Sequence, residues 1–215
     1  MAREQLNLRT ARIGDVEALA QLEAACWPAN LPATSVQLAA RISAFAAGQW
    51  LVENDENLVA YSSAQQITDA TLQSRGHSYR FLTDNDSLTG THTDNAEVHH
   101  LIGISVHPHW RGQQLGRRLL DRQIARAWEH PSTTRVLGFT RPVGHRAFPE
   151  ISLDEYVARQ GVDLPADPVL AFHQQAGARI ISVHEGFRPE DLEALGAGVL
   201  IEYPTEINQV HPETA

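Results

Sequence analysis

The sequence contains no lysine, because all 17 of its basic residues are arginine. This absence excludes catalysis through a lysine Schiff base and excludes the GxxxxGKS/T phosphate loop, since both need a lysine amine. A single cysteine, Cys26, excludes an internal disulfide, so a reducing, cytoplasmic setting is the expectation. No apolar run approaches the roughly 18 residues of a membrane-spanning helix, and the first residues lack a signal-peptide pattern.

The chain is acidic overall, but its arginines are clustered. A net charge of −9 argues against nucleic acid or an anionic membrane as the main partner. Five arginines nevertheless lie between positions 111 and 126. A solvated helix face is one explanation of such a cluster. Because this one adjoins a glycine-containing turn, it favours an anionic ligand.

Hydrophobic periodicity predicts one α/β domain over residues 1–215, without internal repeats. Residues 69–95 and 141–166 lack clear periodicity and are expected to be irregular insertions, the second with a short helix near 153–159. Further helices are expected after Asp15, after Thr34 with Gly48 as C-terminal cap, and at 115–128 and 168–176. Strands are expected at 6–9, 50–53, 58–67, 96–106, 135–140, 179–184 and 198–203.

Residues 104–129 combine a strand, a turn and an amphipathic helix. The first turn of a helix carries backbone N–H groups without partners, and the helix dipole adds about half a positive charge there. Glycines let an anion approach the backbone closely. Arg111, Arg117 and Arg118 would add charge-assisted hydrogen bonds. The sequence therefore predicts an anion site at this turn.

The stretch ISVHPHWRGQQLGRRLLDRQIARA resembles the acetyl-CoA-binding motif of the GNAT superfamily of N-acetyltransferases. The signature Q/R-x-x-G-x-G/A falls on Arg111 through Gly116, with Gln114 where the middle glycine is usual. LRTARIGDVEALAQLEAACWP and DPVLAFHQQAGARII are similar to the superfamily's first strand and helix and its last helix and strand. GFTRPVGHRAFPEISLDEYVARQG resembles the acetyltransferase-like domains found beside bacterial carbon–nitrogen hydrolases.

The resemblance implies the GNAT fold, an α/β domain with a central mixed, mostly antiparallel sheet of about seven strands flanked by about four helices. It also implies acetyl-CoA as acyl donor. In the superfamily the strand before the motif splays from its neighbour and receives the pantetheine arm and thioester, while the turn holds the pyrophosphate. Carried over by position, the cofactor-binding residues are Ile104, Ser105, Val106, Arg111, Gly112, Gln113, Gln114, Gly116 and Arg117.

Acetyl transfer to an alkylamine needs a base, because an amine with a pKa near 10 is protonated at pH 7. The resemblance favours His100, eleven residues before Arg111, as that base. Strand alternation is expected to place it on one face with Ile102 and Ile104. A histidine held by hydrogen bonds within the sheet is the alternative, and His99 and Glu97 are substitute bases.

His173 stands where many superfamily members carry the tyrosine that protonates the leaving thiolate. It could donate as imidazolium or position a water, and a neutral surface histidine is the alternative. Tyr156 is a more distant candidate acid. The eleven histidines come without a CxxC, an HExxH or a carboxylate at ligand spacing, so no metal site is expected.

These patterns favour a cytoplasmic N-acetyltransferase in which a small-molecule or peptide amine attacks the bound thioester directly. The alternative is a non-catalytic acyl-CoA-binding module that senses the cofactor, kept open by Gln114 and His173. A donor with an acyl group longer than acetyl is a third option. A homodimer is left open.

Overall fold

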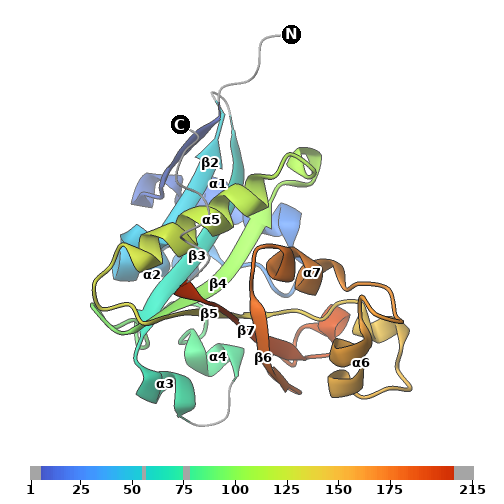
Figure 1. The fold of residues 1–215 in the computed structure, drawn as a ribbon. Coiled ribbons are helices and arrows are strands. Elements are labelled where there is room, and N and C mark those ends of the chain that lie inside the picture. Colours follow the sequence, from blue (N-terminus) through green and yellow to red (C-terminus); the bar gives the residue numbers. More distant parts are fainter. Residues whose placement is uncertain (1–5, 55–56, 75–77, 206–215) are drawn as a thin grey trace.

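The computed structural model describes residues 6–54, 57–74 and 78–205. They form one seven-stranded sheet in the order β1-β2-β3-β4-β5-β7-β6 (Figure 1). Neighbouring strands are antiparallel except β4 and β5, which are parallel. This mixed, mostly antiparallel sheet confirms the predicted fold class. The strands are β1 Asn7–Thr10, β2 Gln49–Glu53, β3 Leu58–Ile67, β4 Val98–Val106, β5 Arg135–Thr140, β6 Arg179–His184 and β7 Gly198–Tyr203.

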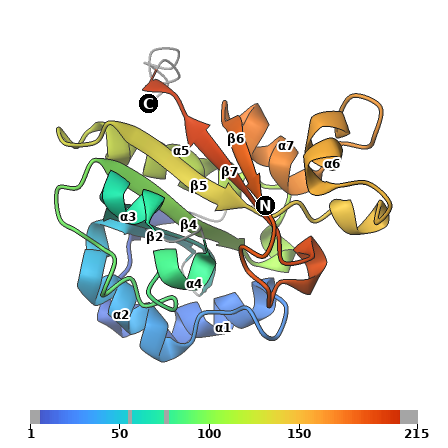
Figure 2. The same cartoon turned by 90° about the horizontal axis from the view of Figure 1, so that it is seen from below.

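Helices cover both faces of the sheet (Figure 2). One face carries α5 Leu115–Trp128, α6 Leu153–Arg159 and α7 Pro168–Gln175, and the other carries α1 Val16–Cys26, α2 Ser35–Phe45, α3 Asp69–Gln73 and α4 Tyr79–Leu82. The expected irregular insertion at 69–95 thus contains two short helices. Among the described residues, none of these helices has the length and apolarity required to cross a bilayer.

The start of α2 follows from its cap. The Thr34 side chain accepts a hydrogen bond from the Gln37 amide, and the Gln37 side chain accepts one from the Thr34 amide, which is a capping box. The predicted cap at the other end is wrong, because α2 ends at Phe45 and a 3-10 turn, Ala46–Gly48, follows. A Cβ on Gly48 would lie 2.5 Å from the Ala64 carbonyl oxygen. Glycine is needed there for close approach to β3.

Strand β4 contains one residue more than its partner β3. Ser63 pairs with Gly103 and Ala64 pairs with Leu101, so Ile102 is the extra residue of a β-bulge. A bulge shifts the pleat by one position, and residues beyond it point to the opposite face from the one that simple alternation predicts. Such bulges are common next to active sites.

The bulge reverses the predicted facing of β4. Before it, His99 lies against Gln123 of α5; after it, Ile104 also packs on the α5 side, beside Leu115. His100 therefore faces the α3–α4 side, in contact with Gln65 of β3. The prediction that His100 and Ile104 share a face is wrong, because it assumed an uninterrupted pleat.

The segment after α4 is fastened to α2. The Arg41 side chain donates from Nε to the Asp86 carbonyl oxygen at 2.8 Å, and its guanidinium also pairs with the Asp86 carboxylate. The Tyr79 hydroxyl donates to the same carboxylate. Because Arg41 is only 4% exposed, this buried, hydrogen-bonded ion pair holds the insertion against the face of the sheet.

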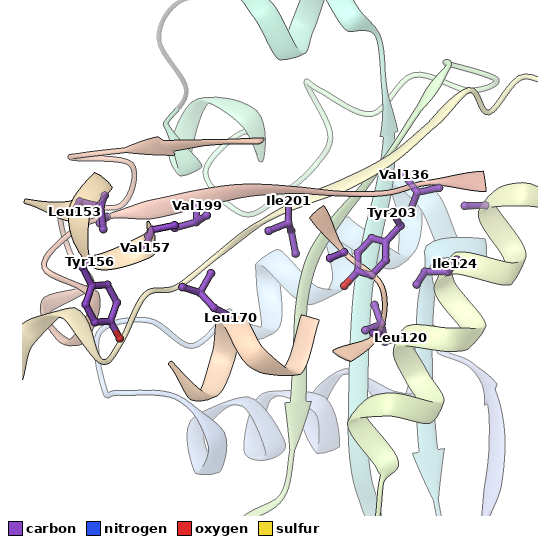
Figure 3. Packing of buried hydrophobic residues seen from close by; sticks show 14 residues of the cluster. Leu120, Ile124, Val136, Leu153, Tyr156, Val157, Leu170, Val199, Ile201 and Tyr203 are labelled. Atoms are coloured by element: carbon purple, nitrogen blue, oxygen red, sulfur yellow. The ribbon is translucent and has the colours of Figure 1, made fainter. Parts of the chain in front are cut away.

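The largest core cluster lies between the sheet and α5, α6 and α7 (Figure 3). It joins residues far apart in the sequence, so the second half of the chain is held by packing rather than by local contacts. Its fully or nearly fully buried side chains include Leu120, Ile124, Val136, Leu153, Tyr156, Val157, Leu170, Val199, Ile201 and Tyr203.

Leu120→Ala should lower the free energy of unfolding by about 2–5 kcal/mol, because the substitution removes a fully buried side chain and leaves a cavity. Leu192→Ala is the matched control, since Leu192 is 77% exposed. Its effect should stay within about 0.5 kcal/mol. Urea unfolding measures both, and equal effects would contradict the core assigned here.

Candidate active site

The parallel strands β4 and β5 stop pairing half-way along β4. Val98–Leu101 pair with Arg135–Gly138, and the two strands share no paired residues beyond Leu101 and Gly138. β4 continues beside β3, and β5 continues beside β7. A cavity of about 330 Å³ lies where they diverge.

The cavity is lined from both faces of the sheet. On the α5 and α7 side, a Cβ added to Gly116 would contact Val106 and Phe172 at ordinary van der Waals distances, so this wall is closely packed. On the opposite side, Gly103 lies against the Trp27 ring. The α5-side lining includes Ile104, Val106, Gly116, Val169, Phe172 and His173, and the opposite lining includes Cys26, Trp27, Ser63, Tyr79, Gly103, Ser105 and Arg188.

The turn before α5 has the geometry of an anion cradle. Gly112 has φ +79°, a conformation that favours glycine, and no other atoms lie within 4 Å of the position of its absent Cβ. Gln114 is also left-handed, with φ +60°, and precedes the first residue of α5. Turns with such left-handed residues aim successive N–H groups to one side, and the helix N-terminus adds more. The backbone here fits a phosphate group.

The predicted cofactor residues fall into two groups. Ile104, Ser105, Val106, Arg111 and Gly116 line the cavity, while Gly112, Gln113, Gln114 and Arg117 belong to the turn and the first turn of α5. The Arg117 side chain pairs with Asp121 and donates to the Gln175 carbonyl oxygen at 3.3 Å, so it also ties α5 to α7. Their individual contacts with coenzyme A stay predictions.

His173 lines the cavity from α7. Its Nδ1 lies 2.5 Å from the Tyr203 hydroxyl, so Nε2 is the ring nitrogen left for a ligand. Burial lowers the pKa of His173 to about 4, and the imidazole is therefore neutral at pH 7. Burial also raises the pKa of Tyr203, so the phenol stays protonated. The neighbours of His173 favour a neutral imidazole over an imidazolium donor.

His100 is not among the residues that line the cavity. It is 2% exposed, its Nδ1 lies 3.2 Å from Gln65 Nε2, and its ring meets that of Phe139 edge-on. Burial lowers the pKa of His100 to about 3. The bulge at Ile102 and this packing turn the ring away from the reaction space, and its role as a base stays a prediction that this placement does not favour.

The substitute candidates also lie elsewhere. His99 is buried against Gln123 of α5. Glu97 accepts a hydrogen bond from the Asp69 amide at 2.8 Å, at the far end of β4. Tyr156 donates to Asp167 at 3.0 Å between α6 and α7. None of the three lines the cavity. Within the described ranges, no group of three or more His, Cys, Asp and Glu side chains is arranged to hold a metal ion.

Two polar residues at the cavity were not singled out from the sequence. Thr140, the last residue of β5, lines the cavity, and its buried Oγ1 has no hydrogen-bond partner among the described residues. Glu23 is buried on α1 beneath the cavity floor. The sequence does indicate that Glu23 faces the core, because it falls in the apolar stripe of α1 with Leu19, Leu22 and Cys26. A charged residue on a core-facing position is unusual unless it is paired.

Comparison with protein families gives a match to the acetyltransferase (GNAT) family over residues 16–148, more than half of the chain. The chain belongs to this family. The predicted membership is thereby confirmed, and the protein is a GNAT acetyltransferase that uses acetyl-CoA as acyl donor. The splayed strands and the anion cradle agree with this assignment.

Individual relatives span nearly the whole chain. The uncharacterized N-acetyltransferase YkwB of Bacillus subtilis (strain 168) is 29% identical over 205 residues, covering 93% of this chain and 89% of YkwB. The GphF GNAT-like decarboxylase in complex with isobutyryl-CoA is 34% identical, with a TM-score of 0.78 over 92% of this chain and 98% of that one. The loading GNATL domain of CurA from Lyngbya majuscula is 27% identical, with a TM-score of 0.82 over 95% and 99%.

Gln114→Gly should raise the free energy of unfolding by about 1 kcal/mol, because a left-handed backbone costs a residue with a Cβ roughly 1–2 kcal/mol and glycine far less. Gln113→Gly, in the same turn but without a positive φ, is the control and should not stabilise the protein. Thermal unfolding of the two variants measures the difference. Destabilisation by Gln114→Gly would show that the side chain, not the backbone, matters there.

The buried histidines should make the protein less stable in acid. The pKa is lowered by burial to about 4 for His99 and to about 3 for His100, against about 6.5 in the unfolded chain. Below pH 6.5 the unfolded chain binds protons that the folded chain does not. The contribution of these two histidines to the free energy of unfolding is therefore complete above that pH and is lost as the pH drops toward 4. Each histidine contributes up to about 1.4 kcal/mol per pH unit in this range.

His100→Gln should therefore reduce the slope of unfolding free energy against pH between 6 and 4.5 by about 1.4 kcal/mol per unit. His109→Gln, which changes an exposed histidine, should leave the slope unchanged. Urea unfolding at a series of pH values gives the slopes. An unchanged slope in His100→Gln would mean that this imidazole is protonated in the folded protein.

Proposed function

We propose that this GNAT protein transfers an acetyl group from acetyl-CoA to a primary amine by direct attack on the thioester. The observation that carries the proposal is the cavity at the parting of β4 and β5, which is lined from both faces of the sheet. A donor held by the turn before α5 would enter from one face. An acceptor would then approach the thioester from the other. The proposed acceptor is a small-molecule or peptide amine, and the proposed location is the cytoplasm.

Positioning supplies much of the rate in such a reaction. Holding amine and thioester in a near-attack geometry is worth about 7–11 kcal/mol in favourable intramolecular systems. The closely packed wall of Ile104, Val106 and Phe172 would fix the acyl arm, and the Trp27 side would fix the acceptor. The role of His173 depends on its tautomer. With the proton on Nδ1, Nε2 can accept a proton; with Tyr203 donating to Nδ1, Nε2–H is a donor.

The cavity also fits a second reaction, loss of carbon dioxide from a carboxyacyl-CoA. Two observations favour it: the unpartnered hydroxyl of Thr140, which lines the same cavity as His173, and the 34% identity to a GNAT-like decarboxylase. When the C–C bond breaks, its electron pair passes to the thioester oxygen. Hydroxyl and imidazole N–H donors stabilise such an oxyanion. An apolar wall of Ile104, Val169 and Phe172 would also accept a short branched acyl chain.

Acetyl-CoA should bind the wild-type protein, and Arg111→Ala should weaken binding at least tenfold, since a charge-assisted hydrogen bond contributes about 1.5–3 kcal/mol. Arg159→Ala removes the same charge from the surface of α6 and should leave the Kd within twofold. Isothermal titration calorimetry at fixed ionic strength makes this comparison. Absence of binding to the wild-type protein would contradict both reactions.

Two assays on the same preparation separate the reactions. Thiol release from acetyl-CoA across alkylamines, amino acids, aminoglycosides and peptide N-termini should reveal amine-dependent turnover. Carbon dioxide release from malonyl-CoA and methylmalonyl-CoA tests decarboxylation, and Thr140→Val should lower that rate at least tenfold if the hydroxyl stabilises the oxyanion. Binding without turnover in either assay would contradict both proposed reactions.

A further inference from the structure

A buried carboxylate reaches the acceptor side of the cavity through one serine. Glu23 of α1 is 5% exposed, and its Oε1 accepts a hydrogen bond from the Ser105 hydroxyl of β4. Its second oxygen lies 3.4 Å from the Ala33 amide. A buried carboxylate is costly unless it is paired and hydrogen-bonded. The position therefore calls for an explanation beyond filling the core.

The hydrogen bonds of Ser105 leave room for one kind of ligand. A hydroxyl has one donor hydrogen and two acceptor lone pairs. The hydrogen is directed to Glu23, because a carboxylate can only accept, and one lone pair accepts from Trp27 Nε1 at 2.7 Å. One acceptor lone pair remains on this oxygen, and Ser105 is among the residues that line the cavity. A ligand at Ser105 must consequently be a donor, such as an N–H group.

The bulge at Ile102 puts this hydroxyl on the face opposite the donor. Beyond the bulge, Ile104 and Val106 face α5 and its anion cradle, whereas Ser105 faces α1. The thioester expected along this strand would lie within one residue of the Ser105 side chain. An amine that approaches from the Trp27 side would lie beside Ser105, because Trp27 and Ser105 are hydrogen-bonded to each other and both line the cavity.

A second, smaller cavity of about 20 Å³ lies behind Ser105. Its lining is mixed but includes several polar side chains, and a space of this size is large enough for one water. Glu23 there faces Arg41 of α2, Tyr61 of β3, Tyr79 of α4 and Arg188 of the loop before β7. Such a water would accept the proton from the carboxylate.

We propose that Ser105, backed by Glu23, is the proton acceptor for the incoming amine; this rests on the acetyl transfer proposed above. The ammonium passes one proton to Ser105 Oγ as the serine hydrogen moves to Glu23 Oε1. The freed amine nitrogen bonds to the thioester carbon, and the C–S bond breaks. The second N–H proton goes to the departing sulfur, and Glu23 returns its proton to water.

Glu23→Gln keeps the size of the side chain and, through its amide oxygen, the hydrogen bond from Ser105, but it cannot take the proton. With acetyl-CoA and the best alkylamine from the panel, kcat/KM should fall about 100-fold, within the range of general-base contributions. With hydroxylamine, which is weakly basic and arrives unprotonated, the loss should shrink to less than tenfold. The Kd for acetyl-CoA should stay within twofold. Glu17→Gln, on the exposed side of the same helix, should change none of these values.

Ser105→Ala tests the same path from the other end and should give the same amine-dependent loss. The double variant should lose no more than either single variant, because residues that act as a unit are non-additive. An equal loss with both amines, or a weakened Kd for acetyl-CoA, would mean that Glu23 only ties α1 to β4 and would overturn the relay. Absence of amine-dependent turnover in the wild-type protein would instead overturn the proposed function, and the relay with it.

Discussion

The parting of β4 and β5 is the constraint on which the rest of the site depends. Where two parallel strands stop pairing, the facing N–H and C=O groups lose their ladder partners, and buried backbone groups require others. Gly138 marks this point, since a Cβ there would lie 3.1 Å from the Leu101 carbonyl oxygen. Close pairing up to that residue and separation after it create a passage through a sheet that is otherwise continuous. A pantetheine arm, with its amides, is the ligand chemistry suited to such strand edges.

The bulge at Ile102 is the second determinant, because it decides which side chains face the passage. It directs His100 into a buried contact with Gln65, and it directs Ser105 toward α1 and Glu23. As a result, Ser105, which is hydrogen-bonded to Glu23, lines the cavity, and His100 does not. The low pKa of the buried histidine is a consequence of the same turn toward the core.

The polar groups around the cavity are not an efficient way to stabilise a core. Thr140 has an unpartnered hydroxyl, Glu23 is a buried carboxylate, and Arg41 and Asp86 form a buried ion pair. Replacing such groups by well-packed apolar residues is often neutral or stabilising. Thr140 lines the main cavity, Glu23 and Arg41 line the smaller cavity behind Ser105, and Asp86 pairs with Arg41. Fixed dipoles and charges of this kind, where little water can compete, are what a reactive site requires.

The sequence by itself determined the seven strands, the main helices and the glycine-containing turn before α5, because these depend on local periodicity, caps and the placement of Gly112. It also carried the family resemblance. Only the tertiary structure decided that His100 turns inward, that His173 meets Tyr203, and that Glu23 reaches Ser105 across 82 positions of sequence. The physical reason is that a bulge depends on strand pairing, and burial and long-range hydrogen bonds depend on packing. The apolar stripe of α1 indicates that Glu23 faces the core, but nothing periodic in the sequence marks the bulge or the pairing of Glu23 with Ser105.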